Sequence, residues 1–84
     1  MANELLKRQI RADRKRAEQI KRLSYSLREA SRREAAGELN VQTSGNVELT
    51  ALGLMESYFD TSRLGHFYRL TAAGHAELAK ALLV

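Results

Sequence analysis

The sequence predicts a mainly α-helical domain that carries one small β-hairpin, and three observations support this fold class. A segment of good helix formers runs from Asn3 to Leu23 without a glycine, and the chain contains no proline. Two short aromatic stretches flank a polar turn over residues 60–65. Glycines and capping residues divide the remainder into short elements, so the expected order is helix, helix, helix, strand, turn, strand, helix.

Basic residues are concentrated in the N-terminal part of the 84-residue chain. Residues 1–34 hold eleven of the 14 Lys and Arg residues against five of the 10 acidic ones. On a helical wheel, the apolar residues of this segment share one face: Leu5, Leu6, Ile10, Ala17, Ile20, Leu23 and Leu27. Basic residues fill an arc of roughly 140° on the opposite side, at ~100° per residue: Arg8, Arg11, Arg14, Lys15, Lys21 and Arg22. We therefore expect one domain, residues 1–84, in which a basic amphipathic arm (1–36) precedes a mildly acidic body (37–84).

The division of the arm is open at this stage. Asn3 can cap the first helix, and Ser24 or Ser26 can cap a second helix over about 27–36. Alternatively, a single helix continues to Gly37, the first plausible stop. Part of the apolar face also fits a heptad, although Asp13 and Ser24 occupy seam positions, which makes the coiled-coil signal weak.

In the body, Thr43 or Ser44 can cap a helix that runs to Leu52 and ends at Gly53. Strands are expected over residues 54–59 and 66–70, with one aromatic of each adjacent couple facing inward. Thr71 can cap a final helix over residues 72–83. A rival interpretation pairs residues 39–43 with 47–49 as a hairpin across residues 44–46. A faint echo also relates residues 48–53 to residues 69–74, but two copies are too few for a repeat architecture.

This order of elements resembles a winged helix-turn-helix domain of the bacterial and phage repressor type. The sharper likeness is local: Leu52-Gly53-Leu54-Met55 resembles a recognition helix that runs into the first wing strand, and residues 68–74 (YRLTAAG) resemble the second wing strand and the start of the C-terminal helix. The resemblance implies that residues 43–52 enter a DNA major groove and that the turn at 60–65 touches the backbone. It thereby adds four candidate contacts from the body: Thr43, Ser44, Asn46 and Arg63. The candidate recognition helix, however, contains no basic residue.

Composition removes several classes of protein. Cysteine is absent, and His66 and His75 have no acidic partner at ligand spacing, so we expect neither a metal nor another cofactor. No glycine-rich phosphate loop or nucleophile elbow is present, which indicates that the protein is not an enzyme. No apolar run approaches the roughly 18 residues of a membrane span, and the N-terminus lacks a secretory pattern, so a cytoplasmic protein is expected. A core this small favours a homodimer, through the apolar face of the first helix and the end of the last helix: Leu78, Leu82 and Leu83.

The leading functional hypothesis is a small dimeric DNA-binding transcription regulator, in which the arm supplies phosphate affinity. Nucleic acid is the expected partner, with DNA preferred to RNA bound through the arm. The alternative from another class is a protein-binding modulator or inhibitor of phage or plasmid type that reuses the winged shape. A plainer interpretation makes the basic face a solvated surface, with Glu4, Asp13 and Glu18 forming pairs along the helix.

Overall fold

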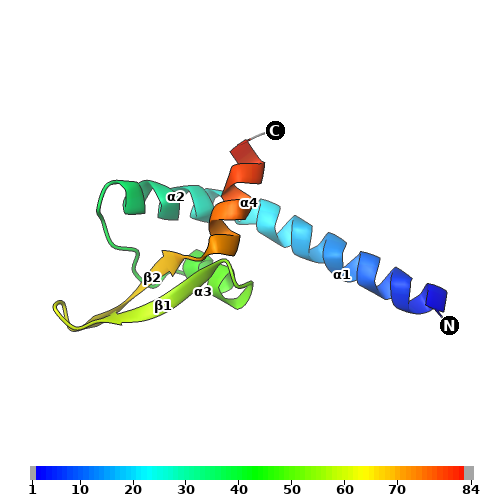
Figure 1. Cartoon of the computed structure of the whole chain (residues 1–84), viewed down its shortest axis with the longest axis horizontal. Helices are drawn as coiled ribbons and strands as arrows, with labels where there is room; N and C mark the ends of the chain where they lie inside the picture. The colour runs from blue at the N-terminus through cyan, green and yellow to red at the C-terminus, as the bar shows by residue number, and fades with distance from the viewer. Residues whose placement is uncertain (1, 83–84) are drawn as a thin grey trace.

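The structure, a computed structural model, describes residues 2–82 and is mainly helical with one antiparallel hairpin (Figure 1), which confirms the predicted fold class at this level. The elements follow the predicted order: α1 (Ala2–Arg22), α2 (Ser24–Ala35), α3 (Ser44–Ala51), β1 (Met55–Asp60), β2 (Gly65–Leu70) and α4 (Ala72–Leu82).

The arm contains two helices separated by the single residue Leu23. The hydrogen-bond ladder barely breaks there, because the Leu23 N–H donates to the Gln19 carbonyl (3.1 Å) and the Leu27 N–H donates to the Leu23 carbonyl (3.0 Å). As a result, α2 extends in nearly the same direction as α1 (Figure 1). Gly37, at φ 74°, ends this helical stretch in the left-handed conformation that glycine adopts without strain.

Local capping signals define α3 as predicted. Thr43 is its N-cap and accepts the Asn46 N–H (3.1 Å), and Gly53 follows its C-terminal end at φ 78°. The rival hairpin across residues 44–46 is therefore wrong, since those residues form the first turn of α3. The preceding loop nevertheless joins the sheet, because Asn40 forms an isolated bridge with Tyr68 of β2.

The hairpin pairs Met55 with Leu70 and Tyr58 with Phe67. Alternation along the strands sends adjacent aromatics to opposite faces. The rings of Tyr58 and Phe67 lie 6.3 Å apart on one face, whereas Tyr68 lies on the other face and packs against the core. Phe59 shares that second face but lies farther along the hairpin and remains exposed.

The hydrophobic core is small and is formed by α2, α3 and the base of the hairpin, with α1 and α4 packed against it through Ile20 and Leu78. Its buried members are Leu23, Leu27, Ala30, Leu49, Leu54, Met55 and Leu70. Leu78 is half-buried against this core, so it contributes to the packing of its own chain. The side chain of Leu82 and the whole of Leu83, also expected at a dimer contact, lie outside what the structure describes. Residues 3–18 of α1 are exposed throughout and project away from the body (Figure 1).

Two glycines allow helices to approach neighbouring segments closely. A β-carbon on Gly74 would collide with the main-chain carbonyl of Leu54, so α4 begins directly against the corner between α3 and β1. A β-carbon on Gly45 would meet the Ser26 hydroxyl of α2. The glycine that the sequence shows in the first turn of α3 is thus explained by its contact with α2.

We predict that Gly74→Ala destabilises the protein by about 1–3 kcal/mol, the usual cost of overpacking. Without the collision the same change would stabilise a helix by up to ~1 kcal/mol, so the sign of the effect tests the contact. Urea unfolding followed by circular dichroism measures it. Gly45→Ala is the comparison variant and should cost less, because a side-chain hydroxyl can rotate away whereas the Leu54 carbonyl cannot. A Gly74→Ala protein more stable than the parent would contradict the observed packing.

Candidate nucleic-acid interface

The predicted basic side chains of α1 form one exposed surface. We call this surface the basic face: Arg8, Arg11, Arg14, Lys15 and Lys21. Within the described chain, none of the five lies within ion-pair distance of a carboxylate. The pairs expected along the helix from Glu4, Asp13 and Glu18 are not formed there, and Asp13 instead accepts a hydrogen bond from Gln9 (3.3 Å). The basic face thus presents guanidinium and ammonium groups that are not paired with any carboxylate of the described chain.

The C-terminal end of α1 is fastened to α3 by two arginines. The Arg16 guanidinium donates to the Leu52 carbonyl (3.1 Å), and Arg22 lies 3.7 Å from the Glu48 carboxylate. Arg22, one of the predicted phosphate contacts, is therefore partly engaged within the protein. Arg16 was not among the predicted site residues. The available signal was its position on the helical wheel, at ~100° per residue, where it falls with Leu23 and Ile20 on the side that faces the body.

Most polar side chains of α3 hold the helix in place. The Thr43 hydroxyl accepts the Asn46 N–H, and the Thr50 hydroxyl donates to the Asn46 carbonyl (2.8 Å). Asn46 is only 7% exposed, and its side-chain amide donates to the Val41 carbonyl (2.7 Å). This burial corrects the expectation that Asn46 contacts DNA, because a buried and bonded amide cannot reach a base edge. Its role is to fix the loop that leads into α3.

The outward side of α3 is consequently almost neutral. Of the predicted contacts, Thr43 and Ser44 are both exposed at its N-terminal end, but the Thr43 hydroxyl is already the helix cap. Val47 is 45% exposed, and Glu48 pairs with Arg22. This surface offers a single uncommitted hydroxyl, on Ser44, for base recognition.

At the tip of the hairpin, Asp60 organises the turn. Its carboxylate accepts hydrogen bonds from the Ser62 hydroxyl (2.6 Å) and the Ser62 N–H (2.9 Å), and Arg63 reaches it at 3.3 Å. The bond from the Ser62 hydroxyl, followed by that from the Arg63 N–H, lowers the pKa of Asp60. Arg63, the predicted wing contact, is exposed but paired, so a phosphate would have to compete with Asp60 for it.

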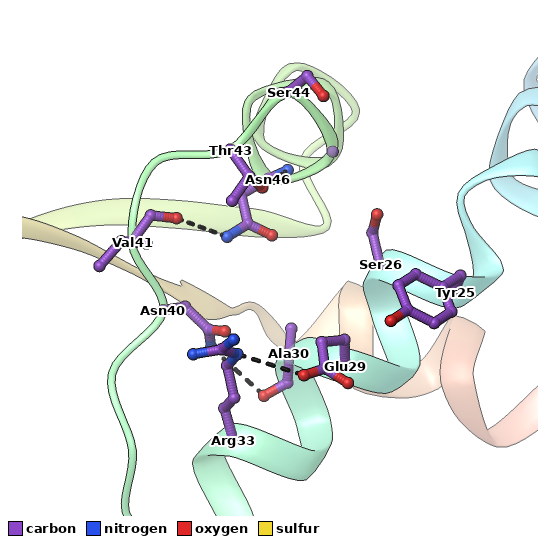
Figure 2. Close-up of a pocket in the computed structure, with 11 residues that line it drawn as sticks. Tyr25, Ser26, Glu29, Ala30, Arg33, Asn40, Val41, Thr43, Ser44 and Asn46 are labelled. Carbon is purple, nitrogen blue, oxygen red and sulfur yellow. Dashed lines mark hydrogen bonds and ion pairs between the residues drawn. The ribbon is translucent and has the colours of Figure 1, made fainter.

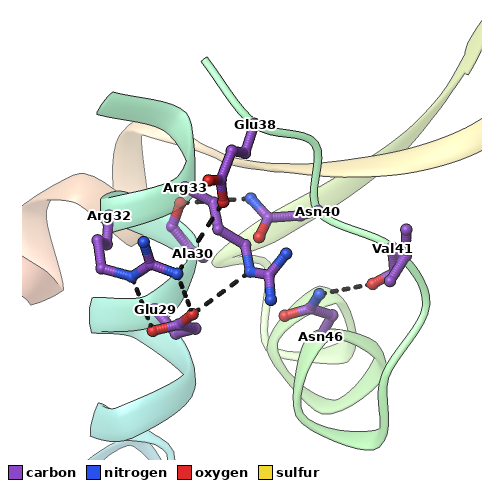
Figure 3. A network of polar contacts seen from close by, with 8 residues as sticks. All are labelled: Glu29, Ala30, Arg32, Arg33, Glu38, Asn40, Val41 and Asn46. Carbon is purple, nitrogen blue, oxygen red and sulfur yellow. Dashed lines mark hydrogen bonds and ion pairs between the residues drawn. The ribbon is translucent and has the colours of Figure 1, made fainter. Parts of the chain in front are cut away.

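A shallow groove of about 240 Å³ separates α2 from the start of α3 (Figure 2). The exposed Tyr25 ring borders one side of it, and Val41 and Ser44 border the other (Figure 2). Its charged residues are already paired, because Glu29 accepts from Arg32 at 2.6 Å and lies 3.4 Å from Arg33 (Figure 3). The Arg32 hydrogen bond lowers the pKa of Glu29 and raises the pKa of Arg32. This groove therefore offers less free charge than the basic face.

Glu34 is a structural residue that sequence reasoning missed. Its carboxylate accepts the Leu70 N–H (2.8 Å) and lies 3.8 Å from His75. The carboxylate thereby satisfies a donor at the edge of β2, beside the place where Asn40 pairs with Tyr68. No local pattern indicates this role, because the two partners are 36 positions apart.

Comparison of the chain with protein-family models, curated proteins and solved structures gave no match. Within residues 2–82, no helix combines the length and apolar character that crossing a membrane requires. In the same part of the chain, no His, Cys, Asp and Glu side chains gather into a group that could hold a metal ion.

We predict that thermal stability falls as the pH drops through the depressed pKa values of Glu29 and Asp60. A lowered folded-state pKa stabilises the native state fully above the ordinary values of 4.5 and 3.8, and that contribution disappears as the pH falls through the folded values. The melting temperature, measured from pH 7 to pH 2, should decline mainly below about pH 4.5. The double variant Glu29→Gln, Asp60→Asn should show a shallower decline. An identical pH profile for parent and variant would remove these two carboxylates as the cause.

Proposed function

We propose that this protein is a non-catalytic, DNA-binding regulator of winged-helix type whose phosphate affinity comes from the basic face of α1. The observation that carries the proposal is the set of five exposed basic side chains without carboxylate partners in the described chain. Such a surface neutralises phosphates and releases condensed counterions, which produces strong, salt-dependent binding. The projection of residues 3–18 from the body supports this use, because a duplex can approach them without meeting the core.

The body supports the winged-helix part of the proposal through its arrangement. A helix (α2), a loop bridged to the sheet at Asn40, a second helix (α3), a hairpin and a final helix (α4) follow one another. In a winged helix the hairpin and the helix before it meet the duplex. Under this proposal the exposed Ser44 and Val47 of α3 and the exposed Arg63 of the turn face the duplex. We therefore propose that the body positions the protein on DNA while reading little sequence.

A second candidate function is protein binding, and a specific observation favours it. Val41 is 52% exposed and Val47 is 45% exposed, on the loop before α3 and on α3 itself. An uncharged surface with exposed valines is more typical of a protein contact than of a surface that recognises bases in the DNA major groove. Under this alternative the body binds a partner protein, and the basic face serves solubility.

We predict that replacing Arg8, Arg11, Arg14 and Lys15 with alanine abolishes most duplex binding. Four lost phosphate contacts should lower the slope of log affinity against log salt by about 3.6, at ~0.9 per contact. The loss should be similar for unrelated duplex sequences, since phosphate contacts carry no base information. Mobility shifts or fluorescence anisotropy at several salt concentrations measure both quantities, and helix content should hold because alanine favours helices.

The matched control removes four basic residues that pair with carboxylates elsewhere: Arg32, Arg33, Arg69 and Lys80. It causes the same change in net charge, so general electrostatic attraction predicts an equal loss, whereas a defined basic face predicts a much smaller one. Equal losses would contradict the assignment. If the parent shifts the mobility of neither duplex DNA nor RNA at low salt, the protein-binding alternative remains. If it shifts RNA alone, the proposed ligand becomes RNA.

A further inference from the structure

Among the described residues, nothing covers the apolar side of the projecting half of α1. Apolar residues are spaced four and three apart along it, with one acidic interruption, in the pattern of a coiled-coil seam. We call this row the seam: Leu6, Ile10, Asp13, Ala17 and Ile20. Leu6 and Ile10 are 61% and 52% exposed, whereas Ile20 already packs against the body's own core. The uncovered part of the seam therefore lies on the projecting half of the helix.

Like charges flank this seam. Lys7, Arg14 and Lys21 follow one edge at seven-residue intervals, and Arg16 lies on the other edge. Two copies paired along their seams would bring these basic edges together, which opposes self-association. The apolar contact is also modest, because the seam offers two large exposed side chains per helix, so it holds two copies together only when this repulsion is screened. The free protein at low salt should therefore remain a monomer.

Nucleic-acid phosphates neutralise the repulsion between the basic edges. We propose that the seam is the docking surface for a second copy of this chain, and that the two copies pair antiparallel once nucleic-acid phosphates neutralise the basic edges. This inference rests on the proposed nucleic-acid binding and deepens it, since the bound polyanion becomes the switch for dimerisation. The expected homodimer then arises through α1.

Asp13 sets the orientation. In a parallel pair in register, Asp13 would face its own copy inside the apolar seam, which places two carboxylates together. In an antiparallel pair with residue 10 opposite residue 13, each Asp13 lies beside a basic edge of the other copy. Leu6 then packs opposite Ala17, a large residue against a small one. Charge and size complementarity within the seam thus both favour the antiparallel arrangement.

The pair leaves the phosphate-binding residues accessible. At ~100° per residue, Arg11 and Lys15 lie roughly 140° to 180° from the middle of the seam. They remain on the outer surfaces of the two helices and face opposite directions, while the bodies lie at opposite ends because each α1 projects away from its own body (Figure 1). The edges that carry Lys7 and Arg14 meet on one side of an antiparallel pair, and one duplex laid over that side can contact both copies.

Salt provides the test, because it acts oppositely on the two interactions. Raising salt from 0.05 M to 1 M shortens the Debye length to about 3 Å and screens the basic edges, so the free chain should change from monomer to dimer. Nucleic-acid binding weakens over the same range. Sedimentation velocity on the free chain should show the apparent mass doubling at 1 M salt, and at low salt a duplex should carry two copies bound cooperatively.

Leu6→Glu and Leu5→Glu form a matched pair of variants. The two residues are adjacent and similarly exposed, at 61% and 68%, but Leu5 lies outside the seam. Leu6→Glu should abolish both the salt-induced dimer and the cooperativity on a duplex, and Leu5→Glu should retain both. Unchanged helix content by circular dichroism checks that neither variant unfolds the arm. The chain contains no cysteine, so Asn3→Cys reports orientation: rapid disulfide formation between copies on a duplex would overturn the antiparallel arrangement.

The remaining outcomes separate this inference from the proposed function. A free chain that stays monomeric at 1 M salt and binds a duplex without cooperativity overturns the seam pairing while nucleic-acid binding stands. A chain that is equally dimeric at low salt overturns the phosphate switch. Equal behaviour of Leu5→Glu and Leu6→Glu overturns the seam as the contact. If the parent binds no duplex at low salt, the proposed function is wrong. Sedimentation velocity on the free chain can still show in that case whether salt induces a dimer.

Discussion

The close approach of α4 to the Gly53–Leu54 corner is the constraint on which the body depends. The Thr71 N–H donates to the Leu54 carbonyl (3.0 Å), and the Thr71 hydroxyl donates to the Gly53 carbonyl (2.7 Å). The same hydroxyl accepts the Gly74 N–H (3.1 Å) and so also caps α4. Because Gly74 has no β-carbon, α4 can start directly on this corner, where α3 ends and β1 begins. One threonine and two glycines thus hold together three of the body's elements.

This corner also accounts for the faint sequence echo. Residues 48–53 and 69–74 share a Leu-Thr-Ala motif followed by a glycine, but the two segments are not equivalent in structure. The first is a helix that ends at a left-handed glycine, and the second leaves a strand and starts a helix. The two segments meet, since the Thr71 hydroxyl bonds to Gly53. The two segments are therefore parts of one junction and not copies of a repeated structural unit.

Sequence reasoning succeeded where the signal was local. Thr43, Gly37, Gly53 and Thr71 fix element ends through caps and left-handed conformations, which need no knowledge of distant partners. It failed where a side chain acts across the fold. Asn46 was expected to contact DNA but is buried by the loop before α3, and Glu34 bonds to an N–H 36 residues away. The contact of Arg16 with the body could have been predicted, because a helical wheel places Arg16 on the side of α1 that faces the body.

The projecting arm is a helix with little tertiary support, and its charges act on its own stability. Isolated helices of about 15 residues are marginal in water even with good helix formers. Like charges four apart, as in Lys7 with Arg11 and Arg11 with Lys15, each cost a few tenths of a kcal/mol, roughly 0.2–0.5. In the proposed complex, a polyanion laid along the basic face removes these repulsions as it binds. In the proposed pair, a second copy packed on the seam adds apolar contacts that a single α1 lacks. We therefore expect phosphate binding, helix formation and pairing of two α1 helices to stabilise one another. In this proposal the body takes part through Arg16 and Arg22, which hold the C-terminal end of α1 against α3 and the residue that follows it.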